Sequence, residues 1–405
     1  MWWLGAVMTQ KSYHKLRTIF AIFPGGYKYH SALFLRQHYQ VISAKRSLCR
    51  LFLDLLVALC FRIWIPARAF SIRKRHKLSL REVFQNIRLS FAGFMDPNDV
   101  ALLNIQDEKG LNYYMRRFEL APIMRQINPA GWQPDCALNN KELFYDRCLS
   151  YGLPHPQIVG LYVDGTITWR NVLYEKKFPD GFIAKPVADR GGARIKRLKV
   201  AFDSPSEQGN LERFIAESLE GEIGPYLIQE FIAPHPLLVP IACDALPTIR
   251  MTTIMNEKGA PELTTQVIRM PSEYLVAVDN LKAGGMIAPL DDSGYLGRAI
   301  RGRRYGEFTV HPATGQKIKG LQVPYFDEAK ELVLKAHYEA FREYTLVGWD
   351  LAIAQFGPVL IEGNSKPSVI VAQRANMKGI GETRFGDLIA YHLARSEEEK
   401  AGNLS

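Results

Sequence analysis

The chain has 405 residues, of which 47% are hydrophobic and 23% charged, and its formal net charge is +10. This composition favours a globular protein of two or three domains over a disordered chain. Its five cysteines are scattered without C-x-x-C spacing, which argues against a zinc site or a disulfide framework and favours a reducing compartment. The sequence contains neither a long uninterrupted apolar run nor a secretory signal pattern, so we expect a cytoplasmic protein without a transmembrane helix.

Positive charge is concentrated in the first part of the chain. Residues 1–90 contain 16 lysines and arginines but only two acids, whereas residues 91–405 contain 35 basic and 39 acidic residues. Such a basic segment indicates an anionic partner, either a membrane surface or another polyanion. No nucleic-acid-binding motif accompanies the basic residues, so nucleic acid ranks below lipid as the partner.

A long apolar helix is predicted within residues 43–70 and is expected to end at Pro66. Its apolar surface is too wide for a helix that is solvated on one side. Two interpretations remain open. Either the helix packs into the body of the protein, or it lies in a membrane interface with Arg50, Arg62 and Trp64 at the rim.

A basic cluster follows this helix and precedes a second helix, predicted over residues 79–90. On the membrane interpretation the protein binds reversibly at the inner face of an anionic membrane, with the cluster near the headgroups. On the other interpretation the cluster is a solvated helix end. The basic residues concerned are Arg73, Lys74, Arg75 and Lys77.

After further helices at residues 97–127 and a Pro- and Gly-containing break at residues 128–134, the pattern becomes α+β. Strands are predicted at residues 157–163, 166–169, 181–185, 195–202, 226–232, 247–255 and 261–270, and helices at 139–151, 210–219 and 327–344. The chain is therefore divided into a basic, mainly helical N-terminal region (1–90), a helical connector (91–132), two α+β subdomains (133–232 and 233–395) and a polar tail (396–405).

A lysine at the end of an apolar strand is the first candidate for a nucleotide site. Lys185 precedes Gly191 and Gly192, and phosphate binding needs both a fixed ammonium group and a loop of small residues with accessible N–H groups. Gln229 and Glu230, at another strand end, could receive an adenine and a ribose. The alternatives are a surface lysine beside a turn and an ordinary strand end.

Two arginines lie on the paired strands 247–255 and 261–270. Arg250 and Arg269 are flanked by apolar residues and threonines, so we expect them to face a polar cleft. The alternative is that they form structural ion pairs with Asp or Glu.

Residues 345–364 predict a β-hairpin, because two apolar, β-prone runs flank the turn at Phe356-Gly-Pro. The hairpin brings Asp350 across from Glu362 and Asn364, which share one face. Two carboxylates and an amide oxygen suit Mg²⁺, which keeps some water and shares phosphate oxygens. The alternative is a hairpin with ordinary polar residues at its ends.

The order of these features resembles the ATP-grasp superfamily, and within it the sugar-transfer-associated branch, which is found with cell-surface polysaccharide genes. The resemblance covers residues 115–393. Where the branch usually shows Asp-Lys, this chain has Asn140-Lys141. The motifs that carry the resemblance are Asn140-Lys141-Glu-Leu-Phe, Gly152-Leu-Pro-His-Pro, Thr248-Ile-Arg250-Met-Thr, Val278-Asp-Asn280 with Gly284-Gly285, His311-Pro-Ala-Thr-Gly315 and Gly348-Trp-Asp350.

The resemblance implies an ATP-grasp fold, in which the two subdomains clasp ATP and one or two Mg²⁺ ions. Asp350, Glu362 and Asn364 would hold the metal, and Arg250, Arg269 and Lys185 would act in catalysis. The nucleotide-binding residues that it implies are Lys141, Lys185, Gly191, Gly192, Gln229, Glu230, Asn280, Gly284 and Gly285.

The activity implied is that of an ATP-dependent carboxylate–amine ligase, which forms an amide through an acyl phosphate. Its substrates would be a small or glycan-linked acid and amine in the synthesis of a surface polysaccharide or envelope precursor. One alternative is a kinase on the same fold that phosphorylates a hydroxyl group. The other is a nucleotide-binding scaffold at the membrane that catalyses nothing.

Overall fold

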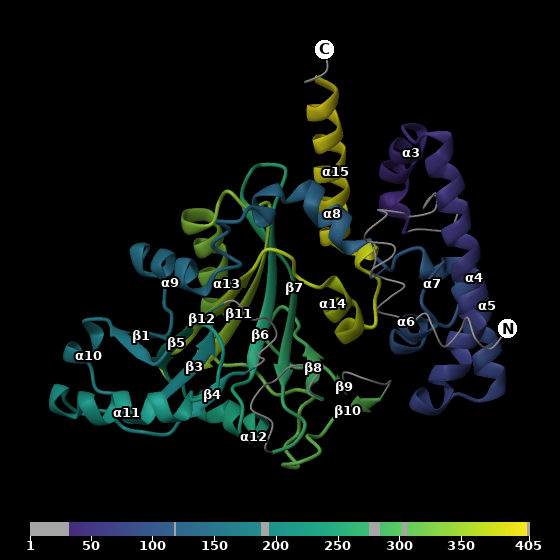
Figure 1. Ribbon diagram of the computed structural model, residues 1–405. Helices are drawn as coiled ribbons and strands as arrows, with labels where there is room; N and C mark the ends of the chain where they lie inside the picture. The colour runs from purple at the N-terminus through teal and green to yellow at the C-terminus, as the bar shows by residue number, and fades with distance from the viewer. Residues whose placement is uncertain (1–31, 117–118, 188–193, 275–283, 302–305, 403–405) are drawn as a thin grey trace.

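The molecule consists of a helical N-terminal region followed by two antiparallel sheets (Figure 1). In Figure 1 the helical region lies at one end, the five-stranded sheet at the other end and the seven-stranded sheet between them. The predicted α+β class, with helices before the sheets, is confirmed. The computed structural model describes residues 32–116, 119–187, 194–274, 284–301 and 306–402.

The N-terminal region is built mainly from two long antiparallel helices, α4 (Leu48–His76) and α5 (Leu80–Gly93). As predicted, α5 begins just after Ser79, where Ser79 and Glu82 form a reciprocal capping box. Within the described residues, no helix has the length and apolar character needed to cross a bilayer. The other elements are η1 (Leu33–Leu35), α3 (Arg36–Ala44), α6 (Pro97–Leu102), α7 (Glu108–Leu111) and α8 (Leu120–Ile127).

The expected end of α4 at Pro66 is wrong, because the helix continues through Pro66 to His76. A proline inside a helix costs about 3 kcal/mol, since it removes a hydrogen bond and crowds the preceding turn. The buried side of α4 continues beyond Pro66, with Ala69 and Ile72 as closely packed as Phe61 before it. Packing along this side offsets the cost of the proline.

The five-stranded sheet has the order β2-β1-β5-β3-β4. One face packs on α11 (Gln208–Ser218) through the cluster that contains Leu211 and Ile215. The other face contributes Ile158 and Leu227 to the main core, together with side chains of α9 (Lys141–Ser150). The strands are β1 (Ile158–Val163), β2 (Thr166–Trp169), β3 (Phe182–Pro186), β4 (Lys196–Leu198) and β5 (Tyr226–Glu230).

The seven-stranded sheet has the order β10-β9-β8-β7-β6-β11-β12. One face packs on α13 (Phe326–Lys335) and the π-helical turn that follows it (Ala336–Ala340). Three of its strands, β8, β9 and β10, lie between residues 271 and 326, where the sequence pattern predicts no strand. The strands are β6 (Thr248–Met255), β7 (Pro261–Met270), β8 (Met286–Pro289), β9 (Ala299–Arg301), β10 (Glu307–Phe308), β11 (Leu346–Ala354) and β12 (Gly357–Asn364).

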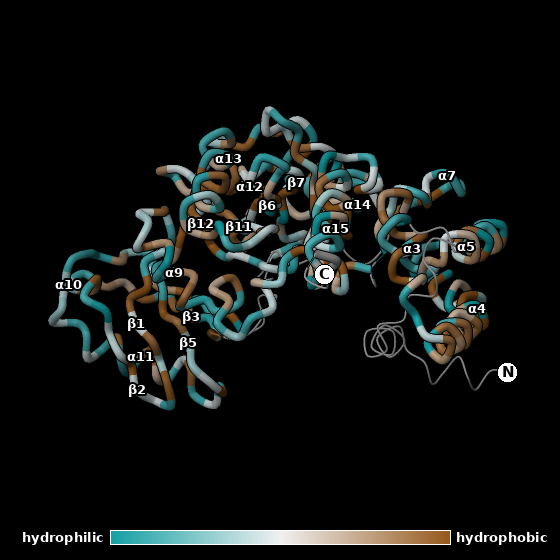
Figure 2. The backbone as a smooth tube through the Cα atoms, turned by 90° about the horizontal axis from the view of Figure 1, so that it is seen from above, coloured by the Kyte–Doolittle hydropathy of each residue, from teal (hydrophilic) through white to brown (hydrophobic). Residues whose placement is uncertain are grey.

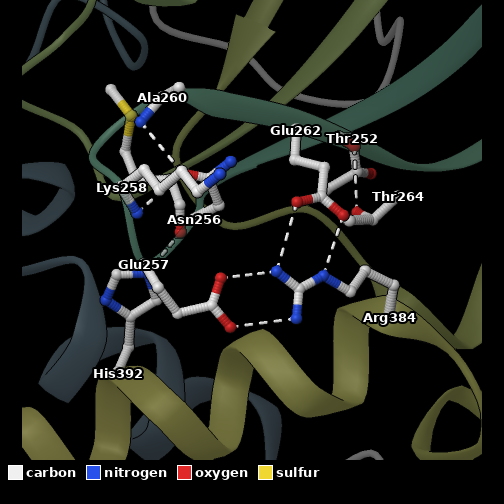
Figure 3. A network of polar contacts seen from close by, with 10 residues as sticks. Thr252, Asn256, Glu257, Lys258, Ala260, Glu262, Thr264, Arg384 and His392 are labelled. Atoms are coloured by element: carbon white, nitrogen blue, oxygen red, sulfur yellow. Dashed lines mark hydrogen bonds and ion pairs between the residues drawn. The ribbon is translucent and has the colours of Figure 1, made fainter.

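Two helices after the sheet complete the structure, α14 (Val369–Asn376) on β7–β9 and α15 (Arg384–Gly402). Arg384 joins α15 to the β6–β7 hairpin, because its guanidinium contacts Glu257 and Glu262, each at 2.9 Å (Figure 3). The predicted boundaries of the five segments stay a prediction, although α15 includes the first residues of the segment that was assigned to a polar tail.

Candidate functional site

The predicted hairpin of residues 345–364 is confirmed. In the β11–β12 pair, Asp350 lies opposite Glu362, and Gly348 lies opposite Asn364. The side chains of Glu362 and Asn364 are two residues apart and therefore point to the same face. The hairpin thus brings the three predicted metal ligands to one end of the strand pair.

Asp350 is buried between the two predicted arginines. Its carboxylate forms a bidentate ion pair with Arg250 of β6, in which Nη2 lies 2.7 Å from Oδ2, and Nη2 of Arg269 lies 3.0 Å from the same oxygen. Burial alone would raise the pKa of the Asp350 carboxyl, but the two guanidinium groups outweigh it and hold the pKa below its usual range. Both arginines therefore form the ion pairs considered above as the alternative to a cleft position.

Thr248 fixes the second arginine. Its Oγ1 accepts hydrogen bonds from Nε and Nη2 of Arg269, at 3.0 and 2.6 Å. Thr248 and Arg269 are direct partners in the β6–β7 pair, so the sheet register produces this contact. Arg250 donates hydrogen bonds from Nε and Nη2 to Asp350, and its Nη1 has no hydrogen bond to any described residue. The two N–H bonds of Nη1 thus have no acceptor among the described residues.

Glu362 is the acid of the hairpin whose oxygens are available. It is half-buried, and its carboxylate has no hydrogen bond or ion pair with any described residue. Among the described residues, the Oδ1 of Asn364 accepts a hydrogen bond only from the backbone N–H of Lys366, at 2.9 Å. A carboxylate and an amide oxygen fit Mg²⁺ when phosphates and water supply the other ligands. The Asp350 carboxylate has about four lone-pair sites and accepts at least three contacts from the arginines, so a metal bound there would lie beside two positive charges.

The described residues contain no group of three or more His, Cys, Asp or Glu side chains arranged to hold a metal ion. A metal at this site would therefore take most of its ligands from phosphate and water, as Mg²⁺ commonly does in nucleotide sites. The metal role of Asp350, Glu362 and Asn364 stays a prediction.

Lys185 of β3 connects the two sheets through Tyr145 of α9. The buried ammonium donates to the Tyr145 hydroxyl at 2.5 Å, and this hydroxyl donates to the backbone oxygen of Ile361 in β12, also at 2.5 Å. Burial lowers the pKa of Lys185 to about 7; the nearby Glu362 opposes this shift and Lys141 adds to it. A lysine from the first sheet thus lies beside the predicted metal-binding strand of the second.

The start of α9 positions Lys141. Asn140 is the N-cap of this helix, and its side chain accepts hydrogen bonds from the N–H groups of Glu142 and Leu143. Asn and Asp are equivalent in this capping role, which explains how the chain tolerates Asn140 before the lysine. The Nζ of Lys141 lies 3.4 Å from the backbone oxygen of Val187, just beyond β3.

The close packing of α9 on β12 depends on Gly363. A Cβ atom at this position would lie 2.4 Å from Leu138 and 2.8 Å from the ring of Phe144. Any larger residue would therefore push β12 away from α9, and with it Glu362 away from Lys185.

Gln229 and Glu230 are buried at the end of β5, as the pattern predicted. Glu230 is engaged on both oxygens, by the N–H of Gln157 at 3.0 Å and by the Nζ of Lys176 at 2.5 Å. Gln229 lies beside Tyr145, with its Oε1 at 3.4 Å from the hydroxyl. Gln229 thus borders the Lys185 site, whereas the carboxylate of Glu230 faces Lys176.

Among the predicted loop residues, Gly284 and Gly285 immediately precede β8. Gly284 has φ of +105°, a conformation that favours glycine, and its carbonyl accepts a hydrogen bond from Ser272 at 2.9 Å. Gly191, Gly192 and Asn280 lie outside the described residues, so their predicted contacts with nucleotide stay predictions.

Three residues of this site were not predicted, namely Tyr145, Thr248 and Lys176. Tyr145 is a large polar aromatic within an otherwise ordinary helix pattern, and only the packing of α9 against both sheets identifies it. Thr248 begins the Thr248-Ile-Arg250-Met-Thr motif and lies two residues before Arg250 on the same strand face, and these two signals could have assigned it to the site.

A separate cavity of about 930 Å³ lies between α8, the β6–β7 turn and α15. Arg125, Arg342 and Arg395 are among its lining residues, and none of the predicted site residues lines it. The cavity is therefore distinct from the site described above.

Comparisons with known proteins place the chain in a family. Two D-alanine–D-alanine ligase structures match it, from Bacillus anthracis (13% identity, 65% of this chain and 70% of that chain, TM-score 0.35) and from Helicobacter pylori (16%, 64% and 61%, 0.35). Similarities this low carry no argument about activity, and no curated protein matches the sequence. The family model for sugar-transfer-associated ATP-grasp proteins matches residues 123–385, which is most of the chain. The chain therefore belongs to the sugar-transfer-associated ATP-grasp family.

Proposed function

We propose that this protein is an ATP- and Mg²⁺-dependent carboxylate–amine ligase. It would act in the cytoplasm on a small or glycan-linked acid and amine, in the synthesis of a surface polysaccharide or envelope precursor. The observation that carries the proposal is the position of Lys185: its buried ammonium, from one sheet, lies near Glu362 of the other. Glu362 in turn lies opposite Asp350, which holds the Arg250–Asp350–Arg269 ion pairs. Phosphoryl transfer requires positive charge around the phosphates and an acid for the metal.

The reaction has two balanced steps. An oxygen of the substrate carboxylate attacks the γ-phosphorus of ATP, and ADP leaves with the electrons of the broken P–O bond. The amine nitrogen then attacks the acyl carbon, inorganic phosphate leaves, and the nitrogen loses a proton to give the amide. Bound Mg²⁺ supplies neutralisation of the phosphate charge.

The chain's own residues would divide the work between phosphates and substrate. Lys141 and Lys185 bind phosphate oxygens, Gln229 and Glu230 lie at the nucleoside, and Glu362 and Asn364 bind the metal. Arg250 would donate from Nη1 to the acyl phosphate, where a well-placed donor lowers the barrier by roughly 2.7–4 kcal/mol.

Asp350 has two candidate roles in this proposal. The sequence pattern assigns it to the metal, whereas its ion pairs favour a positioning role in which it holds both arginines in place. A metal bound by Asp350 would have to overcome the repulsion of the two guanidinium groups that the carboxylate already holds. Variants of Asp350 and Glu362 distinguish the two roles. Substituting a metal ligand changes the Mg²⁺ concentration that activity requires, whereas substituting a positioning residue leaves this requirement unchanged.

The test uses the purified full chain with ATP, Mg²⁺ and a panel of acids and amines. A ligase releases ADP and phosphate together and forms an amide, detected by mass, only when both acid and amine are present. With acid alone, added hydroxylamine should trap the acyl phosphate as a hydroxamate. A kinase would instead give ADP and a phosphorylated alcohol without free phosphate, and a scaffold would give no product.

Variants tie any activity to the site. Glu362→Gln should remove activity, whereas Glu328→Gln, which changes an exposed glutamate on α13, should not. Equal activity in these two variants would separate the reaction from the proposed site.

A further inference from the structure

Helix α4 has an exposed apolar side along most of its length. Between Leu48 and Ile63, seven large apolar side chains have exposed fractions between 41% and 85%. They recur every three or four residues and so lie on one side of the helix. The opposite side, with Phe61, Trp64 and Ile65, is buried against the rest of the protein. The exposed side chains are Leu48, Leu51, Phe52, Leu55, Leu56, Leu59 and Ile63.

This apolar side continues onto α5. Phe70 near the end of α4 and Phe84 of α5 are both exposed, and their rings meet edge to face with centroids 6.2 Å apart. Leu80, at the start of α5, is exposed as well. We call these ten exposed side chains the α4–α5 apolar face. From Leu48 to Phe70 it is about 33 Å long at the rise of an α-helix.

A surface of this kind is unusual in a soluble monomer, where large contiguous apolar patches mark interaction sites. Figure 2 shows α4 as mainly hydrophobic and at the edge of the molecule, away from both sheets. The face therefore lies where an extended partner can reach it without contacting the ATP-grasp sheets.

The charges around the face are almost all positive. Arg62 is exposed within it, and a cluster of exposed basic residues at the end of α4 borders it, formed by Arg73, Lys74, Arg75 and Lys77. Between residues 32 and 93 the sequence has only two acids. Asp54 is buried against Arg46, and Glu82 is held in the capping box of α5. The face and its border are thus apolar and cationic.

We propose that the α4–α5 apolar face binds the surface of an anionic lipid bilayer, with α4 lying in the plane of the interface. An interfacial helix places its apolar side about 5–10 Å into the headgroup and acyl boundary, and basic residues pair with anionic lipids. Each basic residue near such a surface adds about 1 kcal/mol. The protein would then work where membrane-linked precursors are found.

Two other occupants fit the charge less well. A second copy of the chain would bring two cationic borders together, and like charges at an interface oppose association. Residues 1–31 contain four lysines and arginines and no acid, so they would add positive charge to a cationic border. Anionic lipid is the partner that neutralises the border while it covers the apolar face.

The first test is co-sedimentation of the full chain with vesicles of phosphatidylcholine, with or without phosphatidylglycerol. Binding should require the anionic lipid and weaken as salt rises from 0.1 to about 0.5 M, because salt screens the charges. Leu55→Glu with Leu59→Glu should weaken binding at least tenfold, and so should Arg73→Glu with Lys74→Glu. The matched controls are Ile223→Glu, at an apolar side chain that is 82% exposed on the five-stranded-sheet subdomain, and Lys317→Glu with Lys319→Glu. Both should bind as the wild type does.

The second test needs no change to the face. Cys49 and Cys60 are exposed on α4, whereas Cys136 and Cys148 are buried. An environment-sensitive fluorophore on Cys60, with Cys49 and Cys243 changed to serine, should shift to the blue on anionic vesicles and stay unchanged on neutral ones. Equal partitioning onto both kinds of vesicle, or onto neither, would overturn the proposal. A second result would also overturn the proposal: the protein binds no vesicles but associates with itself, and Leu55→Glu with Leu59→Glu abolishes this self-association. The face would then be a dimer interface.

Discussion

Asp350 and Arg250 lie directly opposite each other in the β6–β11 pair and form a buried, bidentate ion pair. Arg269, one strand further along the sheet, contacts the same carboxylate at 3.0 Å. One negative charge therefore holds two positive charges at the centre of the candidate site. The next residue across the sheet, Glu362, keeps its own carboxylate available.

Replacing Asp350 by asparagine should strongly destabilise the protein. Asp350→Asn leaves two largely buried guanidinium groups without their counter-charge, and breaking a buried pair in this way costs about 3–5 kcal/mol. The free energy of unfolding, measured in urea at pH 7, should fall by roughly that amount. A fall of less than about 1 kcal/mol, the usual size for a surface pair, would contradict this account.

The pH dependence of this loss has a definite sign. The pKa of Asp350 is lower in the folded protein than its ordinary value of 3.8. Its contribution to stability is therefore complete above about pH 4 and is lost as the pH falls through the folded pKa. The difference in stability between wild type and Asp350→Asn should be constant from pH 5 to 7 and should shrink in more acidic urea titrations.

Glu362→Gln should abolish turnover while the protein stays folded. The substitution removes a metal-binding charge without changing side-chain volume, and the carboxylate has no described partner whose loss would destabilise the fold. Circular dichroism and the urea midpoint should match the wild type. Turnover near the wild-type rate at ordinary Mg²⁺ concentrations would exclude Glu362 from the metal site.

Lys141→Ala and Lys185→Ala should each weaken ATP binding. Losing a charge-assisted hydrogen bond to phosphate typically costs about 1.5–3 kcal/mol, which is more than tenfold in the dissociation constant. ADP binding should change less for a lysine that reaches the γ-phosphate. Calorimetric titration of both nucleotides measures the two effects, and unchanged ATP affinity in both variants would mean that neither lysine binds phosphate.

ATP affinity should also depend on pH through Lys185. Because its pKa is about 7, the Lys185 side chain is mostly the neutral amine at pH 8, whereas a bound polyanion favours the charged ammonium. ATP binding should therefore take up a proton at pH 8, and affinity should decline as the pH rises above 7. Calorimetry in two buffers of different ionisation enthalpy measures the proton uptake. Lys185→Arg should bind with no such uptake, because arginine keeps its charge.

Much of the architecture could be predicted because it depends on local signals. The turn at Phe356-Gly-Pro and the alternation of residues beside it place Asp350 opposite Glu362. Short strands such as β9, with only three residues, have too few positions for alternation to be recognised. At Pro66 the local rule failed, since packing of the following turns outweighed the cost of the proline.

The contacts within the candidate site depend on register between distant segments, which local patterns do not specify. Arg250 and Asp350 are a hundred residues apart in sequence, and only the pairing of β6 with β11 brings them together. The sequence therefore left the cleft and ion-pair interpretations of the arginines open. In the same way, the link from Lys185 to Ile361 through Tyr145 requires α9 to pack between the sheets.

Tyr145 should act as a positioning residue for Lys185. Tyr145→Phe removes the acceptor of the buried ammonium and the donor to Ile361, so unfolding should become easier by about 1–3 kcal/mol. The charged form of Lys185 also loses a partner, which lowers its pKa. The decline of ATP affinity with pH should therefore begin at lower pH in Tyr145→Phe than in the wild type, a shift that a merely structural role would not produce.

A double-mutant cycle with Lys185→Met isolates this coupling. If the hydroxyl acts on ATP binding through the ammonium, Tyr145→Phe should weaken ATP binding in the wild-type background and much less in Lys185→Met, with a coupling free energy above about 0.5 kcal/mol. Tyr162→Phe is the matched control, since Tyr162 is buried in the sheet that contains Lys185 and its hydroxyl has no hydrogen bond to a described residue. Additive effects of Tyr145→Phe and Lys185→Met on ATP affinity would show that the hydroxyl does not act through the lysine, because a shared hydrogen bond makes the two substitutions interdependent.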